Sequence, residues 1–249
     1  TLQQLHALQP QTIAFENLNS WLGLEVSLQA DKVFAKLVTG GRGGYCFEQN
    51  QLLFRVLQKL GFTVHGLSAR VLWMQSAAEP LPRTHMALLV TLDTRHYLVD
   101  VGFGGLTMTA PLELHNTAEQ ITPHELFRVH HANDLYTVSA RVADQWQALY
   151  CFSLDPSLPV DYETANWYVA THPQSRFVNQ LIAGRADHIG RHSLLDTRYS
   201  RYLPDQAAQT RQVQSPDELR QLLQTEFLLE LDTLATLDDK LTALFRKPL

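Results

Sequence analysis

The stretch GRGGYCFEQNQLLFRVLQKLG, residues 41 to 61, joins an open, glycine-containing segment to a strongly periodic one. Its apolar residues recur at helical spacing, and Gly61 is a natural residue to follow the end of a helix. The apolar set comprises Phe47, Leu52, Leu53, Val56, Leu57 and Leu60. The pattern therefore predicts a helix whose first turn carries Cys46, one of two cysteines in the chain.

A cysteine at the start of a helix can act as a nucleophile. The thiolate is the reactive form, and the unpaired N–H groups and dipole of a helix N-terminus favour an anion. The glycines before Cys46 would let a substrate approach the backbone closely, and the N–H groups around Phe47 could bind an oxyanion. The alternative is that Cys46 is a small buried hydrophobic residue, the commoner role of a lone cysteine.

His85 and Asp100 are the candidate partners of this cysteine. The segments HMALLVTL (85–92) and HYLVDVGF (96–103) predict two antiparallel strands joined by a short turn. His85 begins the first strand and Asp100 lies late in the second, so a bulge or side-chain reach could join them. A carboxylate in so apolar a run should be partly buried and needs a partner. It could orient the His85 ring and stabilise its charged form.

Spacing alone leaves these roles open. His85 could be an ordinary surface or core histidine, and Asp100 could simply cap a turn. The remaining histidines, including His130 and His131, are expected at scattered surface positions. Cys151, between Tyr150 and Phe152, is expected inside a core strand. No C-x-x-C pair supports a metal site, and we expect no bound metal.

The bulk composition indicates a soluble globular protein. The chain has 249 residues, of which 45% are hydrophobic and 18% charged, with a formal net charge of −5. The absence of a basic run argues against a nucleic-acid partner. No apolar run approaches the roughly 20 residues that span a bilayer, so no membrane association is expected. Two cysteines favour a reduced, cytoplasmic protein over one with a structural disulfide.

The order of elements predicts an α+β fold with antiparallel hairpins. A helical first section includes a short helix at 31–38, and a mixed helix and loop is expected at 167–177. A proline-containing loop is expected at 76–84. Ser215, with Pro216 and Glu218 after it, predicts a capping box that begins a late helix. Further strands are expected at 62–73, 125–131, 135–142 and 145–153.

Several motifs in a fixed order resemble those of the arylamine N-acetyltransferase family. The sequence is most similar to the bacterial members, including the enteric enzymes that also act on N-hydroxyarylamines. The similarity extends over nearly the whole chain and is weakest over about the last 70 residues. The motifs are FENL (15–18), RGGYCFEQN (42–50), ARVLW (69–73), RTHMALLV (83–90), LVDVGFGG (98–105) and NWYVATHPQSRF (166–177).

The resemblance implies an architecture of three parts with a Cys-His-Asp core like that of cysteine proteases. A helical bundle at 1–62 would carry the nucleophile, and an antiparallel β-barrel-like domain at 63–165 would carry the histidine and aspartate. A mixed α/β lid would follow at 166–249.

The resemblance also implies a reaction. Cys46, His85 and Asp100 would form the catalytic triad of a transferase that uses acetyl-CoA in a ping-pong cycle. Cys46 would take the acetyl group from acetyl-CoA, and a small-molecule arylamine, arylhydrazine or N-hydroxyarylamine would then accept it. The family's role in xenobiotic metabolism would follow, with no metal, nucleic acid or membrane involved.

Other roles carry over position by position. The resemblance implies an arylamine pocket at Phe15, Val71 and Phe103, although core packing is the alternative for the first two. It implies contacts to CoA at Trp73, Thr84, Gly104 and Phe177. It further implies that Arg42 and Glu16 form a charged pair that braces the loop before Cys46.

Two other functions use the same residues. A cysteine hydrolase of papain or transglutaminase type would have the same constellation but would give the acyl group to water. A binding protein on this fold would leave the cysteine inert. Acceptor choice separates the first from a transferase, and acylation of Cys46 separates the second.

Overall fold

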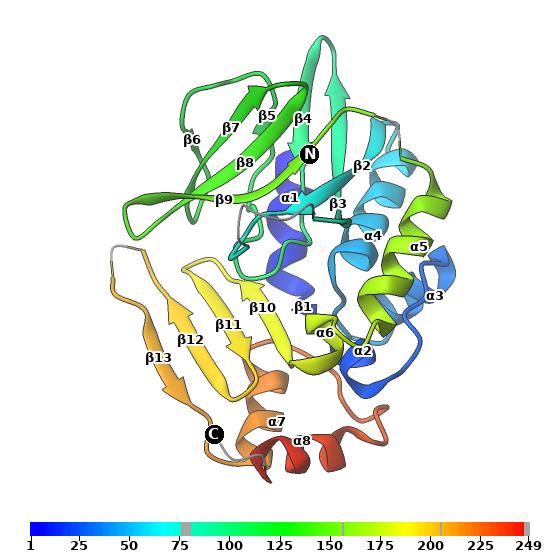
Figure 1. The fold of residues 1–249 in the computed structure, drawn as a ribbon, viewed down its shortest axis with the longest axis vertical. Helices are drawn as coiled ribbons and strands as arrows, with labels where there is room; N and C mark the ends of the chain where they lie inside the picture. Colours follow the sequence, from blue (N-terminus) through cyan, green and yellow to red (C-terminus); the bar gives the residue numbers. More distant parts are fainter. Residues whose placement is uncertain (76–80, 156, 205, 247–249) are drawn as a thin grey trace.

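The structure is a computed structural model that describes residues 1–75, 81–155, 157–204 and 206–246 (Figure 1). The first five residues of the loop expected at 76–84 lie outside the described residues. Most helices of the N-terminal half lie on one side of the first of two antiparallel sheets, whereas the two C-terminal helices lie against the second sheet (Figure 1). The expected α+β fold is confirmed. None of the helices within the described ranges is long and apolar enough to cross a membrane.

The first 60 residues are mainly helical, as expected. The helix at 31–38 is present, but its second half is a π-helical turn over Ala35–Thr39. The other elements of this part are α1 (Leu2–Thr12), β1 (Phe15–Glu16), α2 (Leu18–Leu22), α3 (Ala30–Phe34) and α4 (Cys46–Lys59).

The helix α4 begins at Cys46, as the periodicity of 41–61 predicts. Its apolar face packs on the sheet at β2 and β3. Gly61 follows the helix with a φ of 84°, a conformation that glycine adopts without steric cost. At the other end, the Glu48 carboxylate accepts a hydrogen bond from the Tyr45 N–H at 3.1 Å, which caps the first turn. The sequence thus fixes the first turn that carries the cysteine.

An eight-stranded antiparallel sheet follows α4, in the order β5-β4-β3-β2-β9-β8-β7-β6. It curls so that β5 approaches β7, which gives the barrel-like shape that was expected. All the longer strands predicted from the sequence are present. The strands are β2 (Thr63–Val71), β3 (Arg83–Leu92), β4 (Arg95–Val99), β5 (Leu112–Glu113), β6 (Gln120–Ile121), β7 (Leu126–Ala132), β8 (Leu135–Val142) and β9 (Gln145–Phe152).

The strand expected at 96–103 ends early, at Val99. The next three N–H groups, of Asp100, Val101 and Gly102, donate to side chains instead of to a neighbouring strand. A strand ends where its backbone groups leave the ladder, and local periodicity cannot show this because two of the three acceptors, His6 and Asn50, belong to distant helices.

The chain after β9 forms a helical hairpin and a second sheet. Helix α5 (Pro159–Thr171) begins well before the mixed segment expected at 167–177, and α6 (Arg176–Asn179) lies within that segment. Pro159 at the first position of α5 and an Asp161 carboxylate that accepts from the Leu158 N–H are start signals that the sequence analysis missed. The second sheet has the order β1-β10-β11-β12-β13, with β10 (Ile182–Ala186), β11 (Arg191–Leu195), β12 (Arg198–Tyr202) and β13 (Gln209–Gln212).

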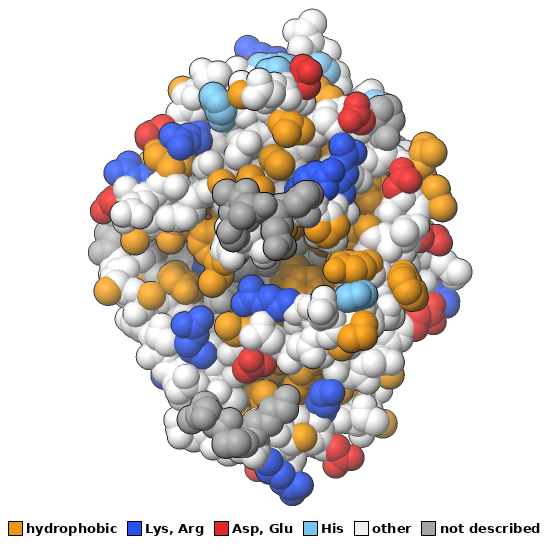
Figure 2. Space-filling model, in the orientation of Figure 1, with side chains coloured by type: hydrophobic (Ala, Val, Ile, Leu, Met, Phe, Trp, Pro, Cys, Tyr) orange, Lys and Arg blue, Asp and Glu red, His pale blue; other side chains and the backbone are white. Residues whose placement is uncertain are grey.

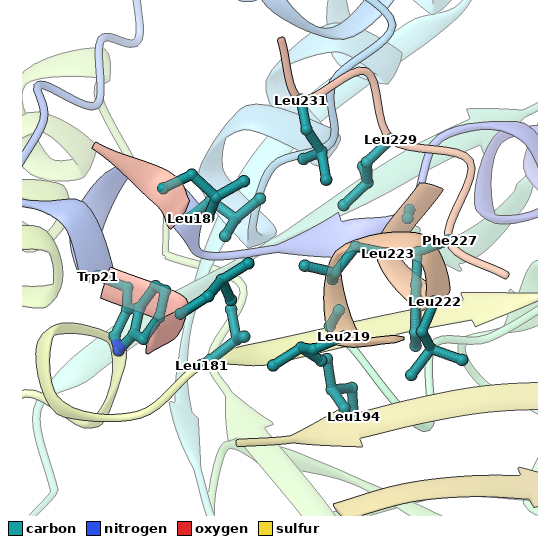
Figure 3. Close-up of a cluster of buried hydrophobic side chains, with 14 of the residues drawn as sticks. Leu18, Trp21, Leu181, Leu194, Leu219, Leu222, Leu223, Phe227, Leu229 and Leu231 are labelled. Carbon is teal, nitrogen blue, oxygen red and sulfur yellow. The ribbon is translucent and has the colours of Figure 1, made fainter. Parts of the chain in front are cut away.

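Two C-terminal helices, α7 (Pro216–Thr225) and α8 (Leu237–Arg246), cover the second sheet. Leu219, Leu222 and Leu223 of α7 point into a buried cluster with Leu194 of β11 and Leu181 (Figure 3). The Ser215 hydroxyl accepts from the Glu218 N–H at 3.2 Å, as expected of the cap. The Glu218 carboxylate accepts from the Gln214 N–H, so the expected capping box is displaced by one residue.

The expected domain boundaries stay predictions. The one after residue 62 falls in the turn between α4 and β2, and the one after residue 165 falls inside α5. Strand β1, from the N-terminal part, is the edge of the C-terminal sheet and pairs with β10. This pairing places Phe15 of β1 beside the space between the two sheets.

Candidate active site

A deep cleft of about 1290 Å³ separates the two sheets (Figure 2). The ends of β2 and β3, the β8–β9 hairpin, the second sheet and the α6 region contribute to its walls. Cys46 and His85 both lie on its surface.

Cys46 lies at the floor of this cleft. Only 4% of its surface is exposed, which is less than the open surface position that the glycine-rich loop suggested. Its thiol lies 3.7 Å from the carbonyl oxygen of Thr84, the residue before His85. Gly102 lies against it, because a Cβ atom on Gly102 would lie 2.7 Å from the Cys46 Cα. The backbone of Cys46 is therefore closely packed, while the residue still lines the cleft.

His85 and Asp100 form a buried pair. The His85 Nε2–H donates to Asp100 Oδ2 at 2.8 Å. No bulge is needed between β3 and β4, whose register runs unbroken from Leu88–Val99 to Leu92–Arg95. Extending that register places Asp100 diagonally across from His85 on the same face of the sheet, so side-chain reach joins them. Asp100 has no exposed surface and is buried more fully than expected.

The pair holds the histidine in its charged form. Burial opposes charge on the ring, but the Asp100 carboxylate, its hydrogen bond and contact with Cys46 raise the pKa of His85 to about 10. Burial likewise opposes the charge on Asp100, yet His85, Asn50 and the Gly102 N–H hold the pKa of that carboxyl below its usual range. An imidazolium beside a cysteine stabilises the thiolate.

Asn50 ties the cysteine helix to the aspartate. It lies one helical turn after Cys46, and its amide donates to Asp100 Oδ1 at 2.9 Å and to the Met86 carbonyl at 2.7 Å. Its Oδ1 accepts from the Val101 N–H at 3.0 Å. The sequence analysis missed Asn50, although its position four residues after Cys46 places both on one helix face.

All seven residues expected at the substrate and CoA subsites line the cleft together with Cys46 and His85. They are Phe15, Val71, Trp73, Thr84, Phe103, Gly104 and Phe177.

Aromatic rings form two walls close to the cysteine. The Phe103 ring lies edge-on to His85, with centroids 5.3 Å apart, and Tyr150 contacts both rings. Two further lining rings form a second group, in which Phe177 packs edge-on against Phe15, with centroids 5.8 Å apart, and against Tyr45. Burial and the nearby Asp100 charge raise the pKa of Tyr150 well above its usual value, so its hydroxyl stays protonated.

Arg42 belongs to the loop that precedes Cys46 and Glu16 to β1, and neither residue lines the cleft. The Arg42 guanidinium donates to Glu16 Oε1 at 2.7 Å, and both side chains are buried. Burial disfavours the Glu16 charge, but Lys36 and Arg42 lower the pKa of this carboxyl. A Cβ atom on Gly43 would lie 2.2 Å from the Ala14 carbonyl oxygen, so the loop packs directly on β1.

The expectation that the other histidines lie at the surface was wrong for two of them. His6 has no exposed surface, and His192 has 4%. The Nε2 atom of His6 lies 3.1 Å from the Asp100 backbone nitrogen. His192 contacts Asp187 and Tyr199 within the second sheet. Local sequence offers no signal for the His6 contact, since Asp100 lies 94 residues away along the chain, whereas the partners of His192 lie only five and seven residues away.

Arg191 is a further buried group that the sequence analysis missed. Its guanidinium donates to both oxygens of Glu125, each at 2.5 Å, and to the Thr107 carbonyl. Arg191 belongs to the second sheet and Glu125 to the loop before β7, so this pair joins the two sides of the cleft. Within the described ranges, no group of three or more histidine, cysteine, aspartate or glutamate side chains is arranged to hold a metal ion.

Comparison with known proteins agrees with this geometry. A sequence family described as N-acetyltransferase matches residues 1–236. An arylamine N-acetyltransferase of Mycolicibacterium smegmatis is 45% identical over 199 residues, 78% of this chain and 72% of that protein. A Salmonella typhimurium protein named arylamine N-acetyltransferase / N-hydroxyarylamine O-acetyltransferase is 37% identical over 229 residues, 91% of this chain and 80% of that protein.

The fold is also similar to that of a solved structure. Arylamine N-acetyltransferase of Mycobacterium marinum in complex with CoA matches with a TM-score of 0.92 at 35% identity, over 98% of this chain and 91% of that one. Family match, sequence identity over most of both chains and shared fold lead to one conclusion. The chain belongs to the arylamine N-acetyltransferase family of acyltransferases.

Proposed function

We propose that this protein transfers the acetyl group of acetyl-CoA to the nitrogen of arylamines and arylhydrazines, in two half-reactions through S-acetylated Cys46. The observation that supports this most is the hydrogen-bonded His85–Asp100 pair beside Cys46 on the floor of the cleft. A related protein of Salmonella has O-acetyl transfer to N-hydroxyarylamines in its name, and we propose this as a second reaction of the same site.

In the first half-reaction, the Cys46 thiolate attacks the thioester carbonyl carbon of acetyl-CoA. N–H groups in the first turn of α4, including that of Phe47, are the candidate donors to the oxyanion. The bond from carbon to the CoA sulfur then breaks, and the CoA thiolate leaves with the proton of the His85 imidazolium. The products are S-acetyl-Cys46, neutral His85 and CoA-SH.

In the second half-reaction, the amine nitrogen attacks the acetyl carbon of S-acetyl-Cys46. His85 takes the proton that the nitrogen loses, and the bond from carbon to Cys46 Sγ breaks. The N-acetyl product leaves, and the thiolate–imidazolium pair is restored. Asp100 holds the ring through Nε2, which leaves Nδ1 for these proton transfers.

The cleft suits both substrates in turn. Its volume of about 1290 Å³ exceeds that of a usual small-molecule pocket, roughly 300–1,000 Å³. The apolar rings of Phe15 and Phe103 suit a flat aryl group, and Trp73, Thr84, Gly104 and Phe177 are our candidates for CoA contacts. Among the described lining residues, four arginines outnumber two carboxylates, which suits the CoA phosphates: Arg141, Arg176, Arg191 and Arg198 against Glu125 and Asp144.

The test is a panel of arylamines, arylhydrazines and N-hydroxyarylamines, each assayed for CoA release from acetyl-CoA and for acetylated product. We expect CoA release to depend on the acceptor and to be lost in Cys46→Ala, which should still fold. Release at the same rate with water alone would identify a hydrolase. Turnover that survives in Cys46→Ala would exclude the proposed mechanism.

A further inference from the structure

The backbone that carries Asp100 is held by side chains from two helices. Strand β4 ends at Val99, and the Asp100 N–H donates to His6 Nε2 of α1 at 3.1 Å. The next N–H, of Val101, donates to Asn50 of α4 at 3.0 Å. Asn50 also contacts the Asp100 carboxylate, whereas His6 contacts only its backbone.

The His6 ring must be neutral to make this contact. A backbone N–H can only donate, so Nε2 accepts and the ring proton lies on Nδ1. Burial lowers the pKa of His6 to about 4, although the Asp100 charge opposes this effect. His6 is therefore a neutral acceptor at physiological pH.

Packing does not explain a histidine at this position. His6 has no exposed surface, and its Nδ1 is buried without a hydrogen-bond partner among the residues that the structure describes. A buried polar atom without a partner destabilises a fold, and an apolar residue would fill the same space without that cost. The feature that an apolar residue cannot supply is the acceptor for the Asp100 N–H.

We propose that His6 is a positioning residue for acetyl transfer, which fixes the Asp100 backbone so that Oδ2 of Asp100 meets Nε2 of His85. This inference rests on the proposed function of Cys46, His85 and Asp100. Without the acceptor on residue 6, the Asp100 N–H has to find another partner and the carboxylate shifts from the ring. The charge on His85, and with it the Cys46 thiolate, is then less favoured.

Two substitutions and a control test this proposal. His6→Leu removes the acceptor, whereas His6→Gln can place Oε1 near the original Nε2. Leu2→Ala truncates another buried side chain of α1, one that cannot hydrogen-bond to Asp100, and so measures the effect of loosening the helix. Each protein is assayed for acetyl transfer and for the rate of Cys46 alkylation by iodoacetamide as a function of pH.

We expect His6→Leu to lower kcat/KM by about 10- to 100-fold, since small displacements of catalytic groups have effects of this size. Its alkylation profile should shift to higher pH. His6→Gln should keep most activity and the original profile, as should Leu2→Ala. A folded His6→Leu protein with the alkylation profile of wild type would overturn the proposal.

A measurement on the wild-type protein covers the case in which His6→Leu does not fold. Nitrogen NMR of the imidazoles should show His6 Nε2 without a proton at neutral pH, and a protonated Nε2 would overturn the proposal. Labelled acetyl-CoA separates the two levels of inference. A wild-type protein that is not acetylated on Cys46 contradicts the proposed function, whereas acetylation of Cys46 at the same rate in wild type and His6→Leu contradicts only the role of His6.

Discussion

At the scale of single residues, the proposed chemistry depends on a buried ion pair. His85 and Asp100 are almost fully buried, and each stabilises the charged form of the other. Removing one partner leaves the other charge buried and unpaired, which is costly. The reactivity of Cys46 is therefore linked to a carboxylate that it does not touch.

Asp100→Asn tests this link. The amide keeps the size of the side chain but removes its charge, so the pKa of His85 should fall and the ring should become neutral near physiological pH. We expect acetyl transfer to fall by about 10²- to 10⁴-fold, as when the aspartate of a hydrolytic triad is replaced. The rise of iodoacetamide reactivity with pH should move to higher pH. A variant with wild-type turnover and profile would show that the carboxylate has no such role.

His85 and Asp100 could be named as candidates from sequence because each is a polar residue in an apolar, strand-like run, and the family resemblance then implied their roles. Asn50 lay within reach of the same reasoning, since its spacing from Cys46 is one helical turn. His6 was beyond such reasoning, because no local sequence pattern around residue 6 indicates a contact with residue 100. Its contact exists only after α1 has packed against the sheet.

At the scale of elements, the first turn of α4 is fixed in place because the backbone at Gly102 lies directly against it. Gly102 leaves no room for a side chain between it and the Cys46 Cα. The periodicity of residues 41–61 was enough to predict α4, and two β-rich runs joined by turn residues were enough for the hairpin of β3 and β4. The end of β4 at Val99 was not predictable, because it depends on acceptors from α1 and α4.

Gly102→Ala should displace the start of α4. Its Cβ would lie 2.7 Å from the Cys46 Cα and 2.9 Å from Asn50 Nδ2, so one of these groups has to move. We expect a loss of at least about tenfold in acetyl transfer from protein that still folds. Gly105→Ala is the matched control, because its nearest neighbour, Ser193 Oγ, lies 3.6 Å away. Equal acetyl transfer by the two variants would show that the close approach of Gly102 to the Cys46 Cα does not constrain the start of α4.

At the scale of the whole molecule, the cleft requires the two sheets to keep a fixed position relative to each other. The Arg191–Glu125 pair joins them beside the cleft, and β1 connects the N-terminal part to the second sheet. The sequence predicted the six longer strands of the first sheet but neither β5 nor β6, and it did not resolve β10 to β13 individually. These strands are short, and the polar residues of β13 do not alternate with apolar ones.

Arg191→Met should destabilise the protein strongly. The substitution leaves Glu125 mostly buried without its partner, and breaking a buried pair in this way costs about 3–5 kcal/mol. Arg95→Met removes a surface pair with Glu113 and should change the free energy of unfolding by less than about 1 kcal/mol. Urea unfolding of both variants checks this, and similar stabilities would refute the linking role of Arg191.

The stability of the molecule should fall in mild acid because of His6. Its folded pKa of about 4 lies below the ordinary value of 6.5, so the unfolded chain binds a proton first as the pH falls. The neutral His6 ring therefore contributes fully to the free energy of unfolding above pH 6.5. This contribution falls as the pH is lowered from about 6.5 to about 4. Between neutral pH and about pH 4.5, wild type should lose about 2–3 kcal/mol more than His6→Gln. Parallel losses in both proteins would contradict a buried neutral His6.

The most direct test of the central claim is mass spectrometry of the protein after incubation with acetyl-CoA and no acceptor. The proposed mechanism predicts one acetyl group, located on Cys46, which disappears with formation of the N-acetyl product when an arylamine is added. Absence of the acetyl group at neutral pH, or its persistence after addition of the amine, would contradict the mechanism.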